Sequence, residues 1–147
     1  MVDLARIKQI PYIKEIIKGD ITKLSTITQL QNSLRRNGSE EKEMVVLADC
    51  SPNLSGAWIT DRAKQIWLAE VALGISNFFL AEKFLTKVFQ GEFFQGLFKK
   101  IKISYKNVKS HKPKTSRKGS AEMYIVATER KNKGVQRYNR QFLLLEE

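Results

Sequence analysis

The sequence is poor in several residue types, and each scarcity excludes a class of protein. Its 147 residues include one cysteine, Cys50, so no disulfide can form within the chain, and a reducing, cytoplasmic setting is expected. One cysteine and one histidine cannot build a structural zinc site, so no metal is expected. No apolar run approaches the ~20 residues of a membrane-spanning helix. The first residues also lack the apolar core and cleavage site of a secretory signal.

Acidic residues are scarce in one part of the chain. Residues 99–140 contain 14 of the 26 lysines and arginines but only 2 of the 15 acidic residues, a net charge of +12. The remaining 12 basic and 13 acidic residues give −1. This asymmetry predicts a face that binds a polyanion; a solvated basic tail is the alternative. An acidic membrane surface is disfavoured, because strand-like and proline-containing sequence prevents one amphipathic helix there.

The hydrophobic content of 42% is sufficient for the core of one domain. Apolar spacing predicts strands alternating with helices, and hence an α/β domain with a largely parallel sheet. We expect the continuous apolar run 44–48 to be a strand buried on both faces. The predicted strands cover residues 1–4, 14–18, 44–48, 84–89, 103–108 and 123–128; the predicted helices cover residues 21–36, 61–80 and 91–101.

Three short motifs place ionisable residues in or after predicted strands. They are Ala-Asp-Cys-Ser-Pro-Asn-Leu-Ser-Gly (48–56), Lys-Val-Phe-Gln-Gly (87–91) and Ser-Ala-Glu-Met-Tyr-Ile-Val-Ala (120–127), which contribute Asp49, Lys87 and Glu122. Such a group can move a proton off a weakly acidic hydroxyl if the lysine is neutral. Burial favours the neutral amine and the two carboxylates favour the ammonium, so the sequence leaves the charge state of Lys87 open. A lysine that only reaches solvent or pairs with a carboxylate is the alternative.

Together the motifs resemble the RrmJ/FtsJ family of RNA ribose 2'-O-methyltransferases over roughly residues 1–130. The resemblance implies a Rossmann-like α/β methyltransferase fold with S-adenosyl-L-methionine as the cofactor. It also implies 2'-O-methylation of a ribose, expected to belong to a uridine, in large-subunit ribosomal RNA; the partner is then ribosomal RNA or the large ribosomal subunit. Asp49, Lys87 and Glu122 match the last three members of the family's Lys-Asp-Lys-Glu tetrad. By this resemblance Lys87 activates the 2'-hydroxyl, Asp49 orients Lys87 and the substrate, and Glu122 supports the charge arrangement.

The resemblance also implies binding residues. Asp3 is expected to hold the ribose hydroxyls of the cofactor, and Asp20 its adenine amino group. Asp49 and Pro52 flank the methyl donor, and Tyr124 falls on a family position where simple packing is the alternative. The RNA-binding residues expected in the basic segment are Lys109, Lys112, Lys114, Arg117 and Lys118.

Two departures from the family pattern affect these expectations. Only Met1 and Val2 precede Asp3, whereas the family places its first tetrad lysine, a glycine-rich cofactor loop and the first, central strand before that position. Glu82-Lys83 stands where the family turns on Gly-Gly. We therefore expect a methyltransferase-like domain at residues 1–130 that lacks its first strand, followed by a basic tail at residues 131–147.

The missing pieces leave three explanations open. The chain is the carboxyl portion of a longer or split enzyme, or a degenerate relative that acts as an RNA-binding module without catalysis, or a protein whose sheet closes differently and still binds the cofactor. A protein-interaction domain that places its basic face on an acidic partner is a further alternative.

Overall fold

The computed structural model describes residues 1–38, 43–53, 55–113 and 121–131 of the chain. These residues form two compact units. Residues 1–38 belong to the first unit, and the other described residues belong to the second. The predicted basic tail, apart from Lys131, lies outside the described residues.

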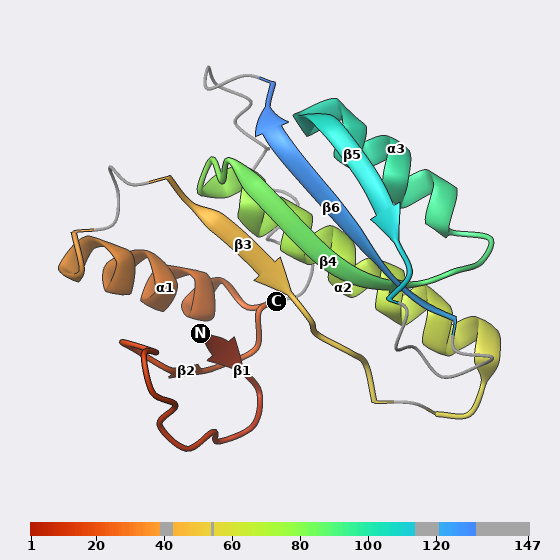
Figure 1. The fold of residues 1–147 in the computed structure, drawn as a ribbon. Helices are drawn as coiled ribbons and strands as arrows, with labels where there is room; N and C mark the ends of the chain where they lie inside the picture. Colours follow the sequence, from red (N-terminus) through yellow and green to blue (C-terminus); the bar gives the residue numbers. More distant parts are fainter. Residues whose placement is uncertain (39–42, 54, 114–120, 132–147) are drawn as a thin grey trace. The chain divides into compact units, whose positions relative to one another are not determined.

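The first unit is a small parallel sheet with one helix. Strand β1 (Val2–Asp3) pairs with β2 (Ile17–Lys18), and α1 (Leu24–Arg36) follows β2 (Figure 1). Ile17 and Ile27 are 6% and 2% exposed, so this pair forms the apolar centre of the unit. Strand β1 lies within the predicted range 1–4, and β2 ends at Lys18 as predicted but is shorter than expected.

The second unit contains a four-stranded mixed sheet with the order β3-β4-β6-β5 (Figure 1). Its strands are β3 (Val45–Ala48), β4 (Lys83–Phe89), β5 (Tyr105–His111) and β6 (Glu122–Arg130). Strand β3 is parallel to β4, but β6 is antiparallel to both of its neighbours. The sheet is therefore less parallel than predicted. The carboxyl ends of β3, β4 and β5 and the start of β6 meet at one edge.

Helices α2 (Trp58–Phe78) and α3 (Phe94–Ser104) cover one face of this sheet and lie behind it in Figure 1. Apolar residues recur along both helices at helical spacing and meet the inward-facing residues of the strands. The resulting core consists of Ala48, Ile66, Ala69, Ala72, Leu73, Phe84, Val88, Phe94, Leu97, Ile101, Tyr105, Ile125 and Ala127.

The exposure of strand β3 differs from the prediction. It was expected to be buried on both faces, but Val45 is 47% exposed and Leu47 is 73% exposed. Only the face that carries Ala48 packs against the core. The physical reason is that both helices of this unit lie on the same side of the sheet and that β3 is its edge strand. Among the described residues, no strand pairs with both β1 and β3.

The helix boundaries differ from prediction in one place that matters for the site. Helix α2 begins at Trp58, so residues 58–60 are helical and not part of a loop. Ile66 and Leu73 of this helix are buried, whereas Phe78 is 44% exposed at the helix end.

Candidate active site

Asp49 and Lys87 form an ion pair at the carboxyl ends of adjacent parallel strands. Asp49 directly follows β3, and Lys87 is the fifth residue of β4. The distance from Lys87 Nζ to Asp49 Oδ1 is 3.0 Å. The Lys87 side chain is only 13% exposed, whereas that of Asp49 is 72% exposed. The pair thus presents its carboxylate to solvent and keeps most of the lysine covered.

Strand β6 supplies the third predicted member of this group. Tyr124 lies directly opposite Lys87 in the antiparallel ladder, and Glu122 lies opposite Phe89. Because side chains alternate along a strand, Lys87, Tyr124 and Glu122 share one face of the sheet. This is the face away from α2 and α3. The structure therefore brings Asp49, Lys87 and Glu122 to the same edge of the sheet.

The surroundings of Lys87 raise its pKa above the usual lysine value. Burial is the largest single effect and lowers the pKa, because it disfavours the charged form. The hydrogen bond and charge of Asp49, with the charges of Glu122 and Tyr124, act in the opposite direction and outweigh it. The ammonium form is therefore favoured at neutral pH, which decides the question that the sequence left open.

Gln65 of α2 connects the two strands that carry the ion pair, and the sequence analysis missed it. Its side-chain Nε2 donates to the carbonyl of Cys50 at 3.0 Å and to the carbonyl of Lys87 at 2.9 Å. The ladder between the strands is paired only as far as Ala48 and Thr86, so the amide bridges them just beyond its end. The sequence offers only a glutamine one turn after Asp61, and its complete burial is apparent only in the structure.

The loop after Asp49 is held by Asp61 in the first turn of α2. The carboxylate accepts hydrogen bonds from the Ser55 backbone at 2.9 Å, the Ser55 hydroxyl at 2.7 Å and the Gly56 backbone at 3.1 Å. These bonds, led by the Ser55 backbone bond, lower the pKa of Asp61. Gly56 has a φ of +83°, a conformation in which glycine is favoured. Asp61 therefore fixes the path of the loop that contains Pro52.

The residues expected to hold the cofactor are divided between the two units. Asp3 is the last residue of β1 and Asp20 lies two residues after β2 in the first unit, whereas Asp49 and Pro52 belong to the second. Asp3 Oδ1 accepts a hydrogen bond from Ala5, and Asp20 Oδ1 accepts two from Thr22. The second oxygen of either carboxylate accepts no hydrogen bond from any described residue. Both aspartates are therefore held by their own loops and keep an acceptor for a hydroxyl or amino group.

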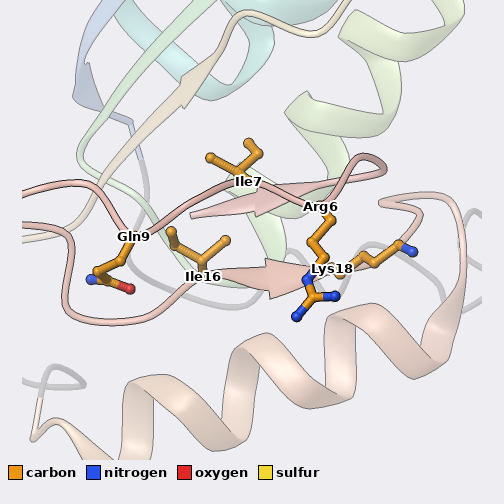
Figure 2. A pocket seen from close by; sticks show the side chains of 5 residues that line it. All are labelled: Arg6, Ile7, Gln9, Ile16 and Lys18. Atoms are coloured by element: carbon orange, nitrogen blue, oxygen red, sulfur yellow. The ribbon is translucent and has the colours of Figure 1, made fainter.

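The first unit also contains a pocket that the sequence analysis did not predict (Figure 2). Its lining residues are Arg6, Ile7, Gln9, Ile16 and Lys18. Neither Asp3 nor Asp20 is among them, so this pocket is not the predicted cofactor site.

Two of the five predicted RNA-binding residues can be placed. Lys109 and Lys112 are exposed, and Lys109 lies opposite Val126 in the β5–β6 ladder. Val126 in turn faces Leu85, which places Lys109 on the same sheet face as Lys87. Lys114, Arg117 and Lys118 lie outside the described residues.

Two features are absent from the part of the chain that the structure describes. No helix there is long and apolar enough to span a membrane. No cluster of three or more His, Cys, Asp or Glu residues there is arranged to hold a metal ion.

An α/β fold with acidic residues at its strand ends and a lysine–aspartate pair beside them defines a methyltransferase-like class. A family model described as FtsJ-like methyltransferase matches residues 2–130. The chain belongs to this family, which confirms the resemblance and the fold class drawn from the three motifs.

Similar proteins named ribosomal RNA large subunit methyltransferase E occur in archaea. The protein from Methanococcoides burtonii is 40% identical over 127 residues, which are 85% of this chain and 46% of that protein. The protein from Methanococcus vannielii is 35% identical over 129 residues, 86% of this chain and 48% of that protein. The chain thus spans about half the length of the curated relatives that it matches.

A solved structure described as a ribosomal RNA methyltransferase from Plasmodium falciparum has the same fold. It superimposes with a TM-score of 0.74 at 20% identity and covers 88% of this chain and 70% of that one.

Proposed function

We propose that this chain takes part in S-adenosyl-L-methionine-dependent 2'-O-methylation of a ribose, that of a uridine, in large-subunit ribosomal RNA. The observation that carries the proposal is the ion pair between Lys87 and Asp49, with Glu122 and Tyr124 on the same sheet face. The names of the archaeal relatives support ribosomal RNA as the substrate class. A substrate of this kind agrees with the cytoplasmic setting expected from the single cysteine.

The proposed roles follow from chemistry and position. S-adenosyl-L-methionine, when bound, supplies an activated methyl group. Asp3 and Asp20 would hold it through their remaining carboxylate oxygens, and Asp49 and Pro52 would flank it. Asp3 and Asp20 fit this role because each carboxylate has one oxygen that accepts no hydrogen bond from its own loop.

Lys87 would handle the proton of the ribose hydroxyl. Only the neutral amine can accept that proton at Nζ, and the raised pKa makes this form a minor one at neutral pH. Asp49 would orient Lys87 through the 3.0 Å contact, and Glu122 would add to the negative field around it. Lys109 and Lys112, with the predicted Lys114, Arg117 and Lys118, would contact phosphates.

The test is methyl transfer by the polypeptide that carries this sequence, measured as 2'-O-methyluridine in nucleosides from under-methylated large ribosomal subunits. Lys87→Ala should lower the rate by about 10²-fold or more, because the group that handles the proton is lost. Lys83→Ala is the matched control: Lys83 is on the same strand and sheet face, but it is paired with Glu43 at 2.6 Å at the other end of the strand.

The control should retain activity. Equal activity of the Lys87→Ala and wild-type proteins would contradict the proposed role of Lys87. RNA binding without any transfer by the wild-type protein would favour the non-catalytic RNA-binding module.

A further inference from the structure

The first two turns of α2 carry an exposed tryptophan stacked on an arginine. Trp58 is the first residue of the helix and is 63% exposed. Arg62 follows one turn later on the same side, and its Cζ lies 3.9 Å from the centre of the Trp58 ring. The guanidinium therefore covers one face of the indole, and most of the remaining ring surface is in solvent.

Arg62 contributes a guanidinium group to this stack. Among the described residues, its guanidinium has no ion pair and no hydrogen-bond partner, and its Nε is buried. The side chain fits closely against Gly91, since a Cβ added there would lie 2.7 Å from Arg62 Nη1. Gly91 thus makes room for the stack two residues after the end of β4.

The stack lies close to the candidate active site. Gln65, which bonds to the carbonyls of Cys50 and Lys87, is on the same helix seven residues after Trp58. Seven residues correspond to about 10 Å along a helix axis. The contact of Arg62 with Gly91 also places the stack at the edge of the sheet where β4 ends, so a single strand of a few nucleotides that passes this edge can extend from the stack toward the ion pair.

We propose that Trp58, backed by Arg62, is a stacking site for an unpaired nucleobase of the RNA substrate, near the nucleotide that is methylated. This inference rests on the proposed function, which makes RNA the ligand. Single-stranded RNA is recognised by stacking of its bases on aromatic rings and arginine planes. The Arg62 guanidinium, which has no ion-pair partner among the described residues, can also bind an adjacent phosphate.

Two single-tryptophan variants test the site. The Trp67→Phe protein retains only Trp58, and the Trp58→Phe protein retains only Trp67. Trp67 is a matched control because it is 48% exposed and nine residues further along α2, which places it on the opposite side of the helix. Each variant is titrated with a single-stranded RNA oligonucleotide and with the same backbone made abasic, and tryptophan fluorescence is recorded.

We expect the base-containing RNA to quench Trp58 and to leave Trp67 nearly unchanged, and the abasic backbone to quench neither. Trp58→Ala should weaken RNA binding about tenfold. Gly91→Ala should displace the Arg62 side chain and reduce the quenching, because the added methyl group takes its place. Circular dichroism confirms that each variant is folded.

Salt-dependent RNA binding without quenching of Trp58 would overturn the stacking site and leave the proposed function intact. Quenching of Trp58 together with no methyl transfer to large ribosomal subunits would support the stacking site and contradict the proposed function. Absence of any RNA binding would overturn the stacking site as well, because no base would then be available to stack.

Discussion

At the residue scale, the central feature is a lysine whose surroundings oppose the form that proton abstraction needs. Burial of Lys87 favours the neutral amine, but Asp49, Glu122 and Tyr124 together favour the ammonium. Asp49 is the strongest of these because it also makes a hydrogen bond at 3.0 Å. Lys87 is therefore well positioned but mostly protonated at neutral pH, so methyl transfer should depend on pH.

Asp49→Asn should lower the pKa of Lys87. The substitution removes the charge that raises this pKa and leaves the burial that lowers it. Methyl transfer by the wild-type protein should rise with pH until Lys87 is neutral, and in the variant this rise should shift to lower pH, at a reduced maximal rate. A pH–rate profile measures the shift, and titration of the Lys87 side chain by NMR checks the assignment. An unchanged or higher pKa in the variant would contradict this account.

The pKa of Asp61 is shifted down, whereas that of Lys87 is shifted up. Its pKa is lowered in the folded protein by bonds from Ser55 and Gly56, so the stabilisation is present above the unfolded-state pKa and is lost as pH falls through the folded value. Asp61→Asn should therefore reduce stability at neutral pH and flatten the loss of stability below about pH 4. Urea unfolding at a series of pH values measures both effects. Wild-type and variant curves of the same shape would show that the Asp61 bonds do not contribute.

At the element scale, the geometry of the site depends on how α2 meets the strand ends. One glutamine satisfies two carbonyls that the β3–β4 ladder leaves unpaired, and one aspartate fixes the loop between β3 and α2. Both side chains come from the first two turns of α2. The helix thus positions the candidate site as well as covering the core.

Gln65→Met should destabilise the second unit by about 1–3 kcal/mol, because the part-buried carbonyls of Cys50 and Lys87 lose the Gln65 donor. The gain from removing the unpartnered Gln65 Oε1 offsets part of this cost. Lys64→Met on the same helix is the control, since Lys64 is exposed. Chemical denaturation gives the free energies, and the methyl-transfer rate should fall because the spacing of Asp49 and Lys87 is less restricted. Equal stabilities of the two variants would argue against the bridge.

At the scale of the whole molecule, charge separates the chain into a nearly neutral part and a basic part. The net charge of +11 is concentrated in residues 99–140. Strand β5 within this segment places Lys109 on the same face of the sheet as Lys87. Lys109 of the basic segment and the candidate site therefore share one side of the second unit.

Lys109→Ala combined with Lys112→Ala should weaken RNA binding and reduce its salt dependence. Each phosphate contact that is lost should lower the slope of log K against log salt by about 0.7 for a single strand. Lys8→Ala with Lys23→Ala removes the same charge from exposed positions of the first unit and should change the slope less. Affinity measured by fluorescence anisotropy at several salt concentrations gives the slopes. Equal slopes for both double variants would show that Lys109 and Lys112 do not contact the RNA.

The sequence by itself determined the kinds and order of the elements, the strand-end positions of Asp3, Asp20 and Asp49, and the approach of Glu122 to Lys87. The elements and the strand-end positions follow from local apolar periodicity and from motifs that each span a few consecutive residues, and the approach of Glu122 to Lys87 follows from the family resemblance. Only the tertiary structure decided the preferred charge state of Lys87, the exposure of Leu47, the bridge made by Gln65 and the stack of Trp58 on Arg62. Each of these depends on which surfaces of distant segments meet, because burial, charge and hydrogen bonding act through space and not along the chain.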